Sequence, residues 1–106
     1  MIGTRHPDSD VPAALMALAG GHGRLLWHKS KDWASTTFKG SRDEVAFEFM
    51  GDGAVEAGDR MLMAMHSAEF VLFDRTVADI ELTYSTRLMR PMRRMIAVIE
   101  LLLVAD

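Results

Sequence analysis

Histidine and cysteine side chains form many of the metal and redox sites of proteins, and this chain contains few histidines and no cysteine. It has four histidines, His6, His22, His28 and His66, and no cysteine. The HExxH pattern is absent, and no two histidines stand four residues apart on an expected helix. Without cysteine there can be no thiolate nucleophile, disulfide or iron–sulfur cluster. We therefore expect no metal site and no cofactor.

The residue types of a nucleophilic triad occur close together around His28. Asp32 and either Ser30 or Ser35 would complete the set. No GxSxG turn is present, and serines in strand-like segments usually form cross-strand hydrogen bonds. We therefore expect a protein without catalytic activity.

The glycine-rich segment at residues 20–23 could expose backbone N–H groups to a phosphate. Phosphate-binding loops usually lead from a strand into a helix, whereas these glycines follow an expected helix. The segment therefore predicts the end of a helix.

Four arginines, Arg87, Arg90, Arg93 and Arg94, form the densest basic cluster of the chain. Guanidinium groups can hold a carboxylate or a phosphate with two hydrogen bonds. The other interpretation is a solvated loop whose arginines neutralise surface acids. If a small ligand binds, the candidate residues are His28, Tyr84, Arg90, Arg93 and Arg94.

Aromatic and basic residues alternate on two expected strands, with Trp27 and Lys29 on one and Trp33 and Lys39 on the next. Such a platform could stack the bases of single-stranded nucleic acid. Acidic residues on the neighbouring strands would repel the phosphates. Nucleic-acid binding is therefore an alternative that we do not favour.

The first half of the chain predicts one helix and three strands. Apolar spacing and N-cap residues predict a helix over 11–19. Residues 24–29 and 33–39 are rich in β-formers, with a turn or bulge at 30–32 between them. Residues 44–50 alternate apolar and polar side chains, which is typical of a half-buried strand.

The second half predicts a helix and two further strands. Residues 54–68 place small and apolar residues on one arc, and residues 76–86 alternate as a strand. Residues 92–104 fit either a helix or a strand; we favour a strand that pairs with the one containing Ile80 and Leu82, because β-branched residues are frequent. The expected order is α-β-β-β-α-β-β: an α+β domain with an antiparallel sheet of about five strands and two helices on one face.

Length and composition set the class of protein. The 106 residues carry a net charge of −3 and suit a single domain over 1–106, with residues 1–9 as a flexible N-terminal segment. The start of the chain lacks the apolar region of a secretory signal, and no stretch approaches the roughly 20 apolar residues of a membrane span. We expect a cytoplasmic location, no membrane contact, and no domain-scale attraction to nucleic acid.

The last segment suggests self-association. It is apolar on both faces when read as a strand, so both faces need a cover. With only two helices expected, the second cover can be another subunit, and the candidate interface residues are Ile96, Val98 and Leu102. We expect a homodimeric binding or assembly domain.

Two other readings remain open. The first helix, with its own apolar stripe, could cover the last segment within one chain. A small-ligand protein or enzyme could instead hold an apolar pocket between the helix over 54–68 and the sheet. That pocket would be lined by Phe47, Phe49, Met61, Met65, Leu82 and Tyr84.

Overall fold

The computed structural model describes residues 10–106, which fold into two helices and four strands. The order along the chain is α1 (Val11–Leu18), β1 (Arg24–Ala34), β2 (Lys39–Met50), α2 (Asp52–Ala64), β3 (Arg75–Leu88) and β4 (Arg94–Ala105). The α+β class with an antiparallel sheet is therefore confirmed. The expectation of a flexible segment over 1–9 lies outside the described residues.

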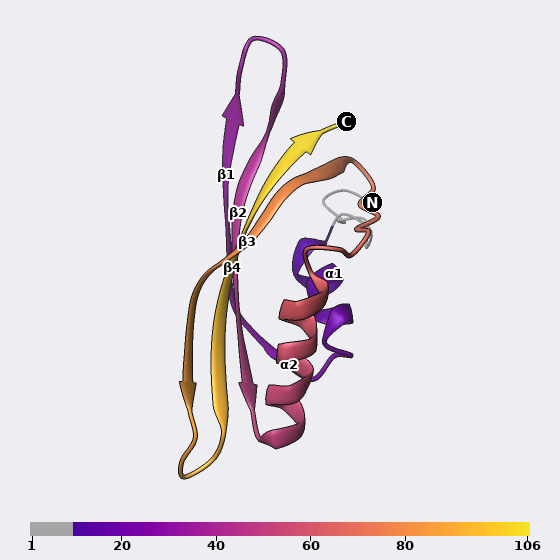
Figure 1. Cartoon of the computed structure of the whole chain (residues 1–106). Helices are drawn as coiled ribbons and strands as arrows, with labels where there is room; N and C mark the ends of the chain where they lie inside the picture. Colours follow the sequence, from indigo (N-terminus) through magenta and orange to yellow (C-terminus); the bar gives the residue numbers. More distant parts are fainter. Residues whose placement is uncertain (1–9) are drawn as a thin grey trace, which may run out of the picture.

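The four strands form one antiparallel sheet in the order β1-β2-β4-β3. Strand β4 lies between β2 and β3, which run parallel to each other and are joined through α2, a split β-α-β arrangement. Both helices lie against one face of the sheet, and the other face is bare of described elements (Figure 1).

The expected number of five strands was wrong, because residues 30–32 form no turn. Strand β1 continues through them, with Ser30 opposite Asp43 and Asp32 opposite Ser41 on β2. The chain turns at residues 35–38, where the Ser35 N–H donates to the Phe38 carbonyl over 2.6 Å and the Phe38 N–H donates to Ser35 Oγ over 3.0 Å. Residues 30–32, whose types are typical of a turn, therefore adopt a strand conformation because they pair with polar residues of β2.

The last segment is a strand, as favoured over a helix. Strand β4 pairs with β3 through Leu101 opposite Ile80 and Ile99 opposite Leu82, so this pairing is confirmed. Its other edge pairs with β2, which makes it a central strand. Strand β4 carries apolar side chains on both faces, and those on the bare face have no helix or strand over them within residues 10–106.

The core lies between the helices and one face of the sheet. Phe47 and Phe49 of β2 and Ile99 of β4 are fully buried there against Leu15 of α1 and Met61 of α2. Helix α2 lies close to the sheet at its small residues: a Cβ on Gly58 would stand 2.5 Å from Met95 Cε. Helix α1 packs with α2 on this covered face, so it does not cover the other one.

Helix α1 begins and ends as the sequence predicts. The Asp10 carboxylate accepts a hydrogen bond from the Ala13 N–H over 3.1 Å, which caps the first turn. Gly20 and Gly21 follow the helix with positive φ of 62° and 81°, a conformation that glycine adopts without strain. The glycine segment therefore ends a helix.

Two β-bulges interrupt the alternation expected along β3. The register shifts between Val77 and Asp79 and again between Leu82 and Tyr84. Each bulge adds a residue to one strand and reverses which face the following side chains occupy. Leu82, opposite Ile99, therefore lies on the covered face, whereas Tyr84, opposite Val98, lies on the bare face.

Candidate functional site

The bare face of the sheet presents an apolar row across all four strands. The register aligns Trp27 of β1, Ala46 of β2, Val98 of β4 and Tyr84 of β3. Val98 is 7% exposed, but the flanking Trp27 and Tyr84 are 40% and 57% exposed. Large aromatic side chains that flank an apolar centre are typical of protein interfaces.

Strand β4 carries further apolar side chains on the bare face, with Glu100 between Val98 and Leu102. Ile96, Leu102 and Val104 lie on the same face as Val98 and are half-buried. No helix or strand within residues 10–106 packs over them. We define the bare-face patch as Trp27, Ala46, Tyr84, Ile96, Val98, Leu102 and Val104. The predicted interface residues Ile96, Val98 and Leu102 thus share one surface.

Glu48 closes one end of the bare-face patch as a carboxylate held by two arginines. Its side chain is only 4% exposed, and Arg24 and Arg94 each donate to one of its oxygens over 2.6 Å. The hydrogen bonds from Arg24 and Arg94 outweigh the opposing effect of burial and lower the pKa of Glu48 below its ordinary value of 4.5.

Replacing Glu48 should reduce the acid sensitivity of the fold. The unfolded chain binds a proton on Glu48 at higher pH than the folded chain does, so this carboxylate stabilises the fold fully above about pH 5. That contribution is lost as the pH falls through 4.5 towards the lower folded pKa. For Glu48→Gln we expect a shallower dependence of the free energy of unfolding on pH between about pH 5 and 2, measured by urea denaturation. Glu69→Gln, in an exposed loop, is the control; an equally shallow curve for both variants would contradict the assignment.

Other polar groups of the bare face also have partners within the chain. Trp27 Nε1 donates to the Glu44 carboxylate over 2.8 Å, and Lys29 Nζ lies 5.7 Å from the centre of the Trp27 ring. Arg42 and Glu100 form an ion pair at 3.4 Å. These contacts show that the face is an ordered surface on which polar and apolar groups have defined positions.

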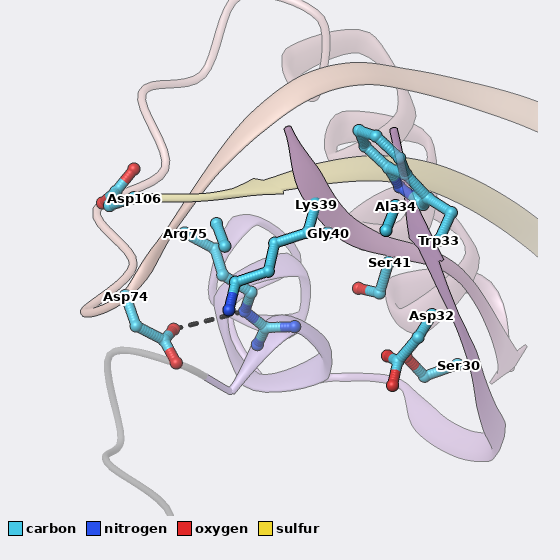
Figure 2. A pocket seen from close by; sticks show the side chains of 11 residues that line it. Ser30, Asp32, Trp33, Ala34, Lys39, Gly40, Ser41, Asp74, Arg75 and Asp106 are labelled. Atoms are coloured by element: carbon cyan, nitrogen blue, oxygen red, sulfur yellow. Dashed lines mark hydrogen bonds and ion pairs between the residues drawn. The ribbon is translucent and has the colours of Figure 1, made fainter. Parts of the chain in front are cut away.

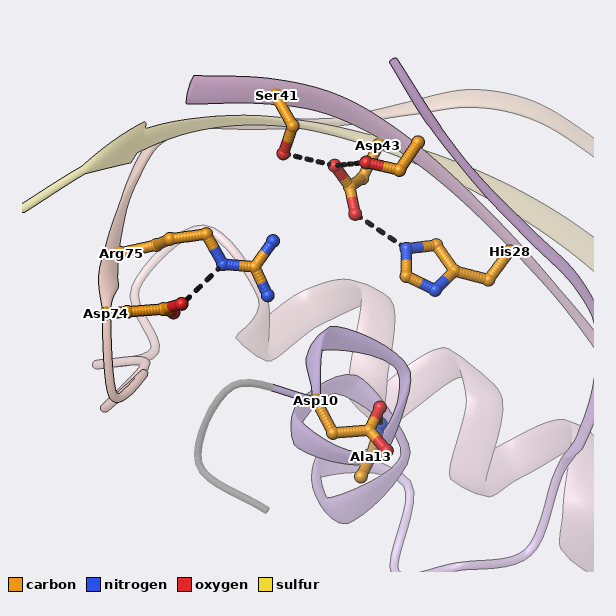
Figure 3. Close-up of polar contacts among 8 residues, drawn as sticks. Asp10, Ala13, His28, Ser41, Asp43, Asp74 and Arg75 are labelled. Atoms are coloured by element: carbon orange, nitrogen blue, oxygen red, sulfur yellow. Dashed lines mark hydrogen bonds and ion pairs between the residues drawn. The ribbon is translucent and has the colours of Figure 1, made fainter. Parts of the chain in front are cut away.

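A second polar cluster lies on the covered face, around the buried carboxylate of Asp43. Asp43 is 1% exposed and accepts hydrogen bonds from Ser41 Oγ at 2.6 Å, Ser30 Oγ at 3.0 Å and His28 Nε2 at 2.6 Å. Figure 3 shows His28 and Ser41 pointing at this carboxylate, with Asp10 of the α1 N-cap across from them. Burial raises the pKa of Asp43, but the hydrogen bonds from Ser41, His28 and Ser30 outweigh it and leave the pKa below the ordinary 3.8.

The Asp43 cluster does not have the geometry of a nucleophilic triad. Ser30 and Ser41 donate to the carboxylate and not to the imidazole, so no base stands ready to take a hydroxyl proton. His28 bonds to Asp43 and not to the Asp32 considered from the sequence. An ionised carboxylate can only accept, so Nε2 of His28 carries the proton of that bond. The arrangement is that of a hydrogen-bonded structural network.

An open cleft of about 690 Å³ borders the Asp43 cluster. Figure 2 shows it between the β1–β2 hairpin, with Ser30, Asp32 and Lys39, and the opposing residues Asp74, Arg75 and Asp106. Arg75 and Asp74 form an ion pair at 3.3 Å. Acidic and basic groups alternate around the cleft, so it has no single charge that would select a ligand. Among the described residues, no group of three or more His, Asp or Glu is placed to hold a metal ion.

The structure separates the candidate ligand-binding residues. His28 lies on the covered face and Tyr84 on the bare face. Arg94 pairs with Glu48, Arg93 lies 3.7 Å from both Asp52 and Glu56 of α2, and Arg90 is exposed in the β3–β4 turn.

Arg87, which completes the arginine cluster, is paired with Asp59 of α2, and their hydrogen bond raises the pKa of Arg87. Three of the four arginines are thus paired with acids, which agrees with the interpretation as a neutralising surface.

The apolar residues assigned to a pocket between α2 and the sheet are packed together. Phe47, Phe49, Met61 and Met65 are at most 2% exposed and belong to the core. Leu82 lies further along the covered face, and Tyr84 lies on the opposite one.

Asp43 and Glu48 are the buried charges that reasoning from the sequence did not single out. The signal for Asp43 was the spacing of two polar pairs, Ser30 with Asp32 and Ser41 with Asp43, which meet on neighbouring strands. That signal can be used only once the hairpin turn is placed at residues 35–38.

Comparisons with known proteins yield no match for this chain among family models, curated proteins or solved structures. In the described part of the chain, no helix combines the length and apolarity needed to cross a membrane.

Proposed function

We propose that this chain is a non-catalytic assembly domain that forms a homodimer through the bare face of its sheet. The observation that carries the proposal is the bare-face patch, whose apolar side chains lie on both sides of the charged row through Glu44 and Glu100 and are covered by no described element. Complete transfer of a large aliphatic side chain from water to an apolar environment contributes about 1.5–3 kcal/mol, and a half-buried side chain gains a part of this when an interface covers it. Ile96, Leu102 and Val104 therefore favour association.

The size of the face suits a dimer. Four strands spaced about 4.8 Å apart, with 11 or more residues each, give a surface of roughly 700 Å². A standard interface buries about 800 Å² per partner. Two sheets can pack face to face with their side chains interdigitated, as in β-sandwiches.

Charge supports a protein partner over nucleic acid or an anionic surface. The register places equal numbers of basic and acidic residues on the bare face, so it carries no net attraction for phosphate. The bases are Arg24, Lys29, Lys31, Arg42 and Arg94, and the acids are Glu44, Glu48, Asp79, Glu81 and Glu100.

The test is the oligomeric state of the native chain and of Val98→Asp, measured by light scattering over a dilution series. We expect the native chain to approach twice its monomer mass of 11.8 kDa, and Val98→Asp to remain near 11.8 kDa. A charge at the centre of the interface would have to be buried without a partner, which costs several kcal/mol. Met63→Asp, on the exposed side of α2, is the matched control and should remain a dimer.

Two further measurements keep this test decisive. Circular dichroism should show that Val98→Asp is folded; if it is not, Leu102→Asp makes the same test at a more exposed position of the patch. A native mass near 11.8 kDa at every concentration would refute the homodimer.

A further inference from the structure

We infer that the two copies pair about a two-fold axis that runs along the strands, so that the basic β1 edge of one copy lies over the acidic β3 edge of the other. This inference rests on the proposed homodimer and adds its geometry and its source of specificity. It begins with where the charges of the bare face lie.

The two edges of the bare face carry opposite charges at the same levels. In one row the register runs from Lys29 of β1 through Glu44 and Glu100 to Glu81 of β3. The next row runs from Lys31 through Arg42 and Leu102 to Asp79. The β1 edge is therefore basic and the β3 edge acidic, one sheet width apart.

These edge charges differ from the charges of the central strands in their partners. Glu48, Arg42 and Glu100 all form ion pairs within the chain. Lys31, Asp79 and Glu81 form none with any residue in 10–106, and neither does Lys29, whose Nζ lies 5.7 Å from the centre of the Trp27 ring. On the bare face, four edge charges, Lys29, Lys31, Asp79 and Glu81, lack an ion-pair partner within residues 10–106, and a second molecule could reach them. Arg24 at the β1 edge is paired with Glu48, and Glu44 on β2 has no ion pair in this part of the chain but accepts a hydrogen bond from Trp27.

The symmetry of a homodimer decides which edges meet. A two-fold axis along the strands exchanges the two edges and keeps each row at its level, so Lys29 faces the partner's Glu81 and Lys31 faces the partner's Asp79. The same axis places Glu44 over the partner's Glu100, two carboxylates that each copy already holds in contacts with its own Trp27 Nε1 and Arg42. An axis across the strands would instead place each edge strand over its own copy. Basic would then face basic and acidic would face acidic, which is unfavourable.

The apolar row through Trp27, Ala46, Val98 and Tyr84 also favours the axis along the strands. With the axis between β2 and β4, the small side chain of Ala46 faces the partner's Val98, and Trp27 faces the partner's Tyr84. Small residues opposite larger ones allow two sheet faces to interdigitate, and aromatic pairs add stabilisation. Aligned sheets cross at about 30°, so the closest contact is over the central strands and the edges meet at their long charged side chains.

Charge reversal tests this arrangement. The first variant combines Lys29→Glu with Lys31→Glu, and the second combines Asp79→Lys with Glu81→Lys. We expect each to raise the Kd of the dimer by about 10-fold or more, because two attractive contacts become repulsive in each half of the interface. The fourfold variant that carries both reversals should return the Kd to within about 3-fold of the native value.

The second variant is the more informative one, since it brings the net charge of the chain closer to zero and should nevertheless weaken the dimer. Glu56→Lys with Glu69→Lys makes the same change in net charge away from the bare face and should leave the Kd within about 3-fold of native. Analytical ultracentrifugation at low ionic strength measures all of these values.

The outcomes separate the inference from the proposed function. A native dimer whose Kd is unchanged in both double variants would overturn the axis along the strands and leave the homodimer standing. A native chain that stays monomeric would refute the proposed function itself. Weakening in both double variants with recovery in the fourfold variant supports the inference.

Discussion

Gly40→Ala should lower the free energy of unfolding by at least about 3 kcal/mol. Gly40 lies on β2 opposite Val104 of β4, and a Cβ at this position would stand 1.8 Å from the Leu103 carbonyl oxygen and 2.8 Å from its carbon. These are backbone atoms, so no side-chain rotation can relieve the contact. The two central strands would have to separate at this end of the sheet.

Thermal unfolding followed by circular dichroism checks this expectation. A loss of this size should lower the Tm by about 10–20 °C for a domain of this length. Gly53→Ala is the matched control, because a Cβ there meets nothing within 4 Å and the position lies in the first turn of α2. Alanine favours a helix over glycine by up to about 1 kcal/mol, so the control should be neutral or slightly stabilised. A Tm for Gly40→Ala equal to that of the native chain would show that the strands are not held this closely.

The strand pairing around Gly40 also explains why the sequence analysis placed the hairpin turn at the wrong residues. Residues 30–32 and 40–41 have the small and polar types that usually form turns, and both segments lie outside the strands expected over 24–29, 33–39 and 44–50. In the structure both lie inside strands and oppose one another, Asp32 with Ser41 and Trp33 with Gly40. Local propensity cannot reveal such pairing, since the stabilising partner lies about ten residues away.

The register of β3 could not be predicted for a related reason. The predicted alternation of side chains between the two faces along residues 76–86 is correct over short stretches. Each of the two bulges then shifts the later side chains to the other face. A bulge depends on the pairing with β4 and leaves no distinct pattern in the sequence of β3. The assignment of Tyr84 to the same side as Leu82 therefore failed, and with it the grouping of both in one pocket.

What the sequence did predict rests on patterns within single segments of the chain. The amphipathic arc of α2 and the end of α1 at Gly20 follow from local rules. The strand at β4 and its apolar bare-face residues Ile96, Val98 and Leu102 follow from a run of β-branched and aliphatic residues. The buried charges could not be predicted in this way, because Asp43 and Glu48 are defined by partners on other strands.

Asp43→Ala should be the other strongly destabilising substitution, with a loss of about 3 kcal/mol in the free energy of unfolding. The carboxylate is 1% exposed and accepts three hydrogen bonds, from His28, Ser30 and Ser41. Its removal leaves these donors without their acceptor and opens a small cavity in the covered face. Asp32→Ala, on the same face but exposed to solvent, is the matched control and should change the stability by less than about 0.5 kcal/mol.

The pH dependence distinguishes the loss of a charged acceptor from the loss of packing. Because the folded pKa of Asp43 lies below 3.8, its carboxylate stabilises the fold at neutral pH, and that contribution disappears as the pH falls below this value. The difference in free energy of unfolding between the native chain and Asp43→Ala should therefore persist from pH 7 to about pH 4 and should shrink from there towards pH 2. Urea denaturation at a series of pH values measures it. A difference that stays constant from pH 7 to 2 would mean that Asp43 contributes only through its volume, and that the network with His28, Ser30 and Ser41 does not hold a charge.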